Sequence, residues 1–227
     1  MAPADRHDRV RFRDRADAGR RLGEALVGDG PVDPIVLALP RGGVPVAAEV
    51  AERLGAPLEV LVARKVGAPG HPEFGIGAIA EGGVRVAGPS LERLGLDDDE
   101  FARLADEERH ELERRVLAYR GGRGLPDVSG RDVVVVDDGL ATGVTAEAAL
   151  LAVRRLGPRR IVLAVPVGAP DTVGRLQPAA DLLVCLTTPG DLVAVGRWYR
   201  TFGQVGDDEV LDLLASHGHA PDGEQNL

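Results

Sequence analysis

Residues Val133–Thr145 read VVVVDDGLATGVT, and this run joins the signals of a strand, a loop and a helix start. The continuous β-branched run Val133–Val136 predicts a strand that is buried on both faces. Two carboxylates, Asp137 and Asp138, follow directly, and a helix is expected over 145–156. We therefore expect a loop at the carboxyl end of a strand, which is where ligands bind in open α/β sheets.

The loop after this strand combines groups that suit a phosphorylated sugar. A glycine-containing turn before a helix N-terminus presents backbone N–H groups and a positive dipole end, which stabilise a phosphate. The hydroxyls of Thr142 and Thr145 add further donors. The carboxylates of Asp137 and Asp138 accept hydrogen bonds from sugar hydroxyls. Together these groups predict a site for ribose 5-phosphate.

The rest of the chain alternates apolar strands with helices, which predicts an α/β protein with a mostly parallel twisted sheet and helices on both faces. Residues 64–83 are rich in glycine and proline, so we expect a long mobile loop there. Residues 1–215 are expected to form a single domain, followed by a polar tail at 216–227. Further strands are expected at 35–39, 58–63, 161–165 and 182–186, and further helices at 15–27, 44–54, 97–120 and 207–215.

Composition and charge exclude several classes of function. The net charge of −9 disfavours nucleic-acid binding, because an acidic surface repels phosphate backbones. Cys185 is the only cysteine and the five histidines lack metal-site spacing, so we expect no disulfide within the chain and no protein metal site. No apolar run approaches the roughly 20 residues that span a bilayer. The charged N-terminus has no apolar core, so we expect neither a membrane segment nor a signal peptide, and a cytoplasmic protein.

The pattern of four apolar residues, two acids and T-G-x-T resembles the signature of type I phosphoribosyltransferases, which bind phosphoribosyl pyrophosphate (PRPP). The resemblance implies the fold of that family with a small C-terminal hood subdomain at 187–215. It implies that Asp137 and Asp138 bind the ribose hydroxyls and act in catalysis by stabilising an oxocarbenium-like transition state. It also implies Mg²⁺ bound mainly through PRPP. The 5′-phosphate would lie on Ala141, Thr142, Gly143, Val144 and Thr145.

Two other segments agree with this resemblance. Arg41, Gly42 and Gly43 follow an early strand, where the family has its pyrophosphate loop. Arginine donates two hydrogen bonds to a phosphate, and glycine allows close backbone approach. Arg64 and Lys65 resemble the arginine–lysine step of adenine and orotate phosphoribosyltransferases, which implies that both bind pyrophosphate and that Lys65 is catalytic. Lys65 is also the only lysine among 27 basic residues, which singles it out independently.

The sequence indicates the base-binding residues less clearly than the PRPP-binding residues. Trp198 and Tyr199 loosely resemble the stacking residues of the hypoxanthine-guanine enzymes, and aromatic faces stack well on heterocyclic bases. The alternative is a small satellite core below the C-terminal helix, and the sequence leaves both open. Ala141 stands where adenine enzymes carry alanine and hypoxanthine-guanine enzymes carry aspartate. A carboxylate from the loop, Glu73 or Glu81, would then handle the proton of the base.

The resemblance implies transfer of ribose 5-phosphate from PRPP to a nitrogenous base, with a purine favoured, as in nucleotide salvage. The alternatives are a non-catalytic regulator that senses PRPP or a nucleotide, and an enzyme acting on another phosphorylated ribose. The charged segment 97–120 departs from the compact purine enzymes. It is expected either to pack between the subunits of a homodimer or to form a solvated face.

Overall fold

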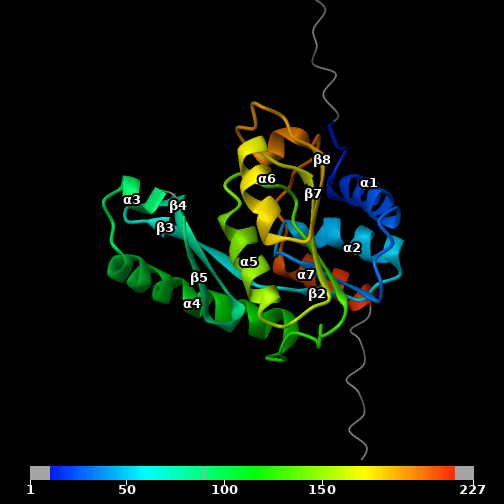
Figure 1. Ribbon diagram of the computed structural model, residues 1–227, viewed down its shortest axis with the longest axis horizontal. Coiled ribbons are helices and arrows are strands. Elements are labelled where there is room, and N and C mark those ends of the chain that lie inside the picture. The colour runs from blue at the N-terminus through cyan, green and yellow to red at the C-terminus, as the bar shows by residue number, and fades with distance from the viewer. Residues whose placement is uncertain (1–10, 89, 218–227) are drawn as a thin grey trace, which may run out of the picture.

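The computed structural model describes residues 11–88 and 90–217, which form two sheets (Figure 1). The first is a five-stranded parallel sheet with the strand order β2-β1-β6-β7-β8. The second is a three-stranded antiparallel sheet with the order β3-β4-β5. The predicted α/β class with a mostly parallel sheet is confirmed.

The parallel sheet contains β1 (Pro34–Ala38), β2 (Leu58–Val60), β6 (Asp132–Val136), β7 (Arg160–Val167) and β8 (Leu182–Thr187). The antiparallel sheet contains β3 (Ala63–Ala68), β4 (His71–Ala80) and β5 (Val84–Ala87). The α-helices are α1 (Arg15–Val27), α2 (Gly43–Leu54), α3 (Ser90–Arg93), α4 (Asp98–Arg120), α5 (Val144–Arg154), α6 (Pro170–Leu176) and α7 (Asp207–Ser216). Three short 3-10 turns are η1 (Glu81–Gly83), η2 (Gln177–Ala179) and η3 (Val195–Trp198).

The central strands are buried on both faces, because their alternate residues face two different cores. Val133 and Val135 of β6 pack in the core that contains α5. Val134 and Val136 pack in the core that contains α1 and α2. A strand in this position needs an apolar side chain at every residue, which explains the continuous valine run.

Caps set the ends of several helices as the sequence indicates. Asp14 caps α1 by accepting a hydrogen bond from the backbone N of Asp17 at 2.7 Å. Asp97 caps α4 in the same way through Glu100 N at 2.8 Å. Gly55 ends α2 with a φ of 61°, in the left-handed region that glycine adopts without strain.

The prediction of an irregular loop at 64–83 is wrong, because β3 and β4 form an antiparallel hairpin there. Its glycines allow close packing as well as turns. A Cβ at Gly77 would lie 2.4 Å from a ring carbon of Phe101 on α4. The predicted strand 58–63 is also divided, since β2 ends at Val60 and β3 begins at Ala63. The antiparallel sheet with α3 and α4 forms a small subdomain, and the hood expected at 187–215 stays a prediction.

Helix α4 is amphipathic and covers the antiparallel sheet of its own chain. Its buried side chains, which include Phe101 and Leu112, face β3 and β4. Its other side carries ion pairs such as Arg103–Glu107 at 2.7 Å. This charged side is exposed, as expected of a solvated face, and packing between subunits stays a prediction.

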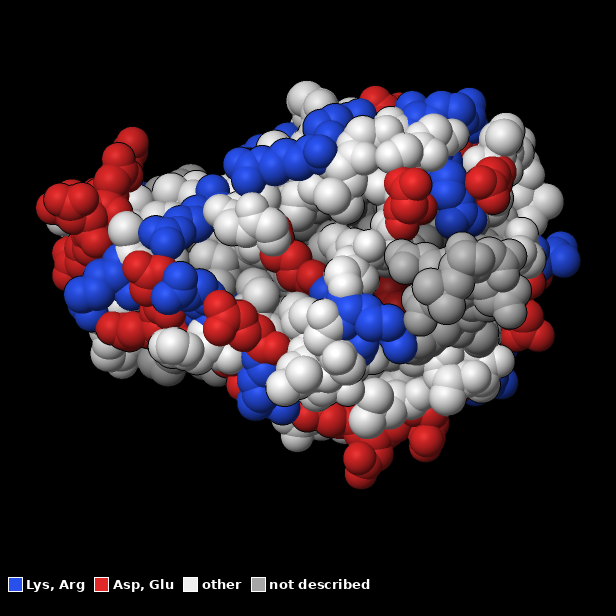
Figure 2. Space-filling view, turned by 90° about the horizontal axis from the view of Figure 1, so that it is seen from below, with Lys and Arg blue, Asp and Glu red and all other residues white. Residues whose placement is uncertain are grey.

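The surface carries mixed charge, and no helix in the described part of the chain is long and apolar enough to cross a bilayer. Figure 2 shows basic side chains interspersed with acidic ones over the face seen from below.

Candidate active site

The loop after β1 contains Gly42 and Gly43 and is called the glycine loop here. It lies against Asp137 and Asp138, the acidic pair, which follow the carboxyl end of β6. The two strands are parallel neighbours, and Leu39 N donates to Val136 O at 2.9 Å just beyond them. A Cβ at Gly42 would lie 2.1 Å from Asp138 Oδ2, and one at Gly43 would lie 2.7 Å from Val136 O. The two loops meet this closely only because these positions are glycine.

The two carboxylates are held by hydrogen bonds and one ion pair. Asp137 Oδ1 accepts from the backbone N of Asp138 at 2.8 Å. Asp138 Oδ2 accepts from Arg15 Nε at 2.9 Å and lies 2.8 Å from Arg15 Nη2. Burial, together with the repulsion of Asp138, holds the pKa of Asp137 well above its usual range. Burial also raises the pKa of Asp138, and Arg15 opposes that shift. A cation developing nearby would favour the ionised forms.

The turn before α5 is held by hydrogen bonds between its carbonyl groups and α6. Gly143 precedes α5 with a φ of 71°. The carbonyl oxygen of Ala141 accepts from Thr172 Oγ1 at 2.6 Å, and that of Thr142 accepts from Arg175 Nη2 at 2.5 Å. Both carbonyls therefore point to α6. Because C=O and N–H of one trans peptide unit point in opposite directions, the next amide in each case points away from α6. The arrangement fits an anion at the helix N-terminus.

A pocket of about 510 Å³ contains Asp138. It is lined by Arg15, Arg41, Gly42, Arg115, Asp138, Phe202, Gly203, Gln204 and Val205. Arg41 lies 3.6 Å from Asp207 Oδ1, and Arg115 Nε donates to Glu111 at 2.8 Å. The gathering of three guanidinium groups beside the glycine loop suits a polyanion such as pyrophosphate.

The Arg64–Lys65 step lies on β3, away from this pocket. Arg64 donates to Glu108 Oε2 of α4 from Nε at 3.0 Å and from Nη2 at 2.6 Å. Successive strand residues point to opposite faces, so Lys65 points away from α4. Neither residue lines the pocket of Asp138 in the described part of the chain. Their role on pyrophosphate therefore stays a prediction.

Trp198 and Tyr199 lie in a buried cluster with Phe12. Their exposed fractions are 6% and 5%, so the satellite core that the sequence left open describes their packing. The Tyr199 hydroxyl donates to the carbonyl oxygen of Asp138 at 2.6 Å, which supports the acidic loop from below. Phe202 is 39% exposed and is the ring that lines the pocket.

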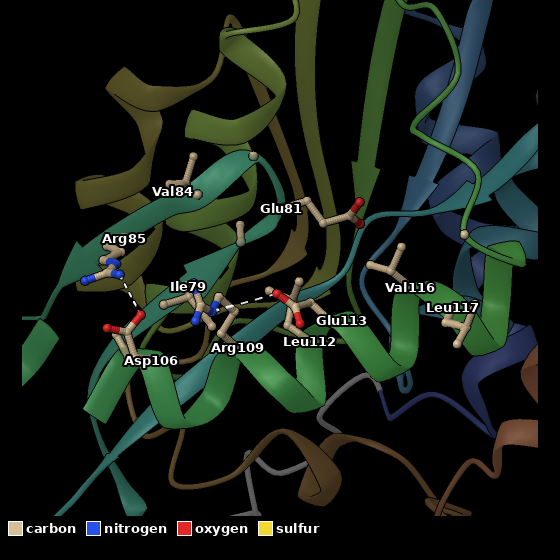
Figure 3. Close-up of a pocket in the computed structure, with 15 residues that line it drawn as sticks. Ile79, Glu81, Val84, Arg85, Asp106, Arg109, Leu112, Glu113, Val116 and Leu117 are labelled. Carbon is tan, nitrogen blue, oxygen red and sulfur yellow. Dashed lines mark hydrogen bonds and ion pairs between the residues drawn. The ribbon is translucent and has the colours of Figure 1, made fainter. Parts of the chain in front are cut away.

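Glu81 is engaged in a structural ion pair. Arg120 Nη2 donates to its carboxylate, and Val62 N donates to it at 2.7 Å. Burial raises the pKa of Glu81, and Arg120 opposes that shift. Figure 3 shows Glu81 beside a groove of about 410 Å³ between α4 and the η1–β5 segment. The other proposed proton carrier, the side chain of Glu73, lies outside the described residues.

The sequence did not indicate Arg15 or Arg115. Arg15 is 123 positions from Asp138, and no local pattern connects them. Arg115 stands within a run of charges that is typical of a helix surface. Phe202 follows the aromatic pair in the sequence, and its exposed ring lines the pocket, while base binding by Trp198 and Tyr199 stays a prediction.

The residues present fit a magnesium ion that is bound mainly through its substrate. No group of three or more His, Cys, Asp or Glu side chains is placed to hold a metal among residues 11–88 and 90–217. The site offers the two carboxylates Asp137 and Asp138 instead. Mg²⁺ is commonly held by one or two carboxylates together with substrate phosphates.

These features define an α/β protein with a candidate ligand site at the carboxyl ends of its parallel strands. Residues 13–193 match the family model described as the phosphoribosyl transferase domain. The chain therefore belongs to the phosphoribosyl transferase domain family.

Two relatives extend this finding. A protein of Mycobacterium tuberculosis (strain H37Rv), whose name gives phosphoribosyl transferase as an inferred activity, is 49% identical over 205 residues. The match covers 89% of this chain and 46% of that protein, so the chain spans about half the length of the curated relatives it matches. The crystal structure of the Thermus thermophilus protein TT1426 is 49% identical, with a TM-score of 0.77. That match covers 92% of this chain and 100% of the other.

Proposed function

We propose that the protein transfers ribose 5-phosphate from PRPP to a nitrogenous base and releases pyrophosphate. The observation that carries the proposal is the contact between the acidic pair and the Gly42–Gly43 loop, beside the amide-rich turn at the start of α5. PRPP would place its 5′-phosphate on that turn, its ribose hydroxyls on Asp137 and Asp138, and its pyrophosphate against the glycine loop.

The chemistry needs charge stabilisation more than covalent help. As the bond from C1 of the ribose to pyrophosphate breaks, positive charge develops on the sugar, and the carboxylates stabilise it at close range. Arg41, the backbone at Gly42 and Arg115 stabilise the negative charge on the leaving pyrophosphate. Mg²⁺, when bound through PRPP, would neutralise part of that charge, and Asp137 and Asp138 are the residues that would hold it.

The acceptor in this proposal is a nitrogenous base, with a purine favoured. The support is the run Asp137–Thr145, which is close to that of the adenine enzymes. Phe202 replaces Trp198 and Tyr199 as the proposed stacking ring, because it is the exposed aromatic ring in the pocket that contains Asp138.

The test mixes the protein with PRPP, Mg²⁺ and a panel of purines and pyrimidines, and measures released pyrophosphate. Asp138→Asn is expected to lower turnover at least about tenfold, because it removes negative charge that faces the transition state. Asp171→Asn, which changes an exposed carboxylate at the start of α6, is the matched control and should leave turnover unchanged.

Two outcomes would contradict the proposal. Tight binding of PRPP with no turnover on any base would instead identify a sensor of this metabolite. A wild-type protein that binds no PRPP at all would remove both functions.

A further inference from the structure

The turn at 141–143, which precedes α5, is supported by the segment that runs from the end of β7 into α6. Leu140 N donates to Val167 O at 2.8 Å, and Ala169 N donates to Leu140 O at 2.9 Å. These two hydrogen bonds form a parallel bridge between Leu140 and Gly168. The chain that enters the turn is therefore fixed to the end of β7 one residue before the turn begins.

Two side chains of α6 hold the next two carbonyl groups of the chain. Thr172 Oγ1 donates to the carbonyl oxygen of Ala141 at 2.6 Å. Arg175 Nη2 donates to the carbonyl oxygen of Thr142 at 2.5 Å. Arg175 Nη1 also pairs with Glu147 in the first turn of α5. One helix thus controls the orientation of two successive peptide groups.

The side chains of α6 also pack against the turn. A Cβ at Gly143 would lie 2.5 Å from Cγ2 of Thr172 and 2.9 Å from Cδ1 of Leu176. Thr172 and Leu176 are both buried. Thr172 therefore makes two separable contacts with the turn, which are the hydrogen bond from its hydroxyl and the packing of its methyl group.

The orientation of the two carbonyls decides where the neighbouring amides point. In a trans peptide unit the N–H is opposite to the C=O, so the N–H groups of Thr142 and Gly143 face away from α6. The proposed function assigns these amides to the 5′-phosphate of PRPP. A turn that rotates its peptide groups freely presents the amides only part of the time, and the affinity for the phosphate falls in proportion to that fraction.

We propose that Thr172 and Arg175 are positioning residues of the 5′-phosphate site, which hold two carbonyls against α6 so that the turn is ordered before the ligand arrives. Both act through the backbone, because each donates to a carbonyl on the side opposite to the amides that would meet the phosphate. The inference rests on the proposed function, since it takes the 5′-phosphate of PRPP as the ligand.

Two substitutions of Thr172 separate its hydrogen bond from its packing. Thr172→Val keeps the shape of the side chain and removes the donor, whereas Thr172→Ser keeps the hydroxyl and removes the methyl group. Thr172→Val is expected to raise the Kd of Mg²⁺–PRPP about tenfold, the order of free energy that one hydrogen bond contributes. Thr172→Ser should bind PRPP nearly as tightly as wild type. Calorimetric titration of the full chain measures both.

A second pair of variants tests Arg175 against a matched arginine. Arg154, at the other end of α5, pairs with Asp181 at 2.9 Å and donates to the carbonyl oxygen of Ala179 at 3.2 Å. It therefore makes the same kinds of contact away from the turn. Arg175→Met is expected to raise the Kd of Mg²⁺–PRPP about tenfold, since a hydrogen bond from a charged donor is lost. Arg154→Met should leave this Kd unchanged.

The loss of affinity should be limited to ligands that carry a 5′-phosphate. Ribose 5-phosphate should lose affinity for Thr172→Val to the same extent as PRPP. Mg²⁺–pyrophosphate, which is expected at the glycine loop, should bind Thr172→Val as it binds wild type. A purely structural role of Thr172 would instead weaken the binding of all three ligands.

The outcomes separate the inference from the proposed function. A wild-type protein that binds no PRPP overturns the proposed function. If wild type binds PRPP, three results overturn the inference: Thr172→Val binds PRPP as tightly as wild type, Thr172→Ser binds it no more tightly than Thr172→Val, or pyrophosphate loses as much affinity as PRPP. Equal Kd values for Arg175→Met and Arg154→Met overturn the role of Arg175, and this pair alone decides if Thr172→Val fails to fold.

Discussion

At the scale of single residues, the most constrained position of the site is Gly42. Its φ of −60° and ψ of −32° are open to any residue, so the need for glycine is purely steric. A Cβ there would lie 2.1 Å from Asp138 Oδ2 and 2.7 Å from its carboxyl carbon. Gly42→Ala is expected to displace the carboxylate and to weaken PRPP binding at least about tenfold, because a misplaced group loses its charge-assisted hydrogen bond. Calorimetric titration with Mg²⁺–PRPP measures the effect.

The control for this substitution is Gly174→Ala on α6. A Cβ at Gly174 meets nothing within 4 Å, and alanine is the better helix former. Affinity should match wild type in this variant, with stability equal or slightly higher. If Gly42→Ala bound PRPP as tightly as Gly174→Ala does, the glycine loop would not form part of the site.

Residue by residue, the sequence predicts the site only where its members are neighbours in the chain. Asp137, Asp138 and the turn before α5 follow one another, and the strand before them points them to one edge of the sheet. Arg15 and Phe202 reach the same pocket from opposite ends of the chain. Side-chain type does not encode such long-range contacts, and only the folded backbone brings them together.

At the scale of elements, a buried ion pair joins α4 to the turn after β4. Arg120 is 1% exposed at the last turn of α4, and its partner Glu81 begins η1. Arg120 Nε is buried without a hydrogen-bond partner, so Glu81 is the main compensation for its charge. Glu81→Gln is expected to lower the free energy of unfolding by about 3 kcal/mol, because an uncompensated buried charge remains. Denaturant unfolding measures this change.

The double variant Glu81→Leu with Arg120→Met distinguishes charge from packing. It replaces the pair by apolar side chains of similar length, a change that is often neutral for buried pairs. The double variant should therefore be more stable than Glu81→Gln alone. A Glu81→Gln protein within about 0.5 kcal/mol of wild type, which is the range of ordinary surface substitutions, would show that the pair does not hold α4 in place.

The elements that the sequence predicted well are those with one dominant local signal. The valine run of β6 defines its element alone. The β3–β4 hairpin was missed because its glycines resemble those of a loop. At Gly77 the glycine makes room for Phe101 of α4, a tertiary demand that overrides local propensity.

At the scale of the whole molecule, the site depends on how the ends of the described chain are joined. The segment around Phe12 pairs with the segment around Tyr199, and aromatic contacts continue from there to Phe202. Ring centroids are 5.4 Å apart for Phe12–Tyr199 and 5.0 Å apart for Tyr199–Phe202. The row of rings ends at the guanidinium of Arg15, so the packing of these rings sets the position of the ion-pair partner of Asp138.

This dependence predicts that two matched core variants lose similar stability but differ in their affinity for Mg²⁺–PRPP. Phe12 and Leu26 are each 1% exposed, and Leu26 lies at the far end of α1. Phe12→Ala and Leu26→Ala should each lower the free energy of unfolding by about 3 kcal/mol, the usual cost of a large-to-small change in a core. Only Phe12→Ala should also raise the Kd for Mg²⁺–PRPP, because it loosens the bridge that positions Arg15. The measurement combines denaturant unfolding with calorimetry at a temperature where both variants stay folded, and equal Kd values would show that the junction of the chain ends does not support the site.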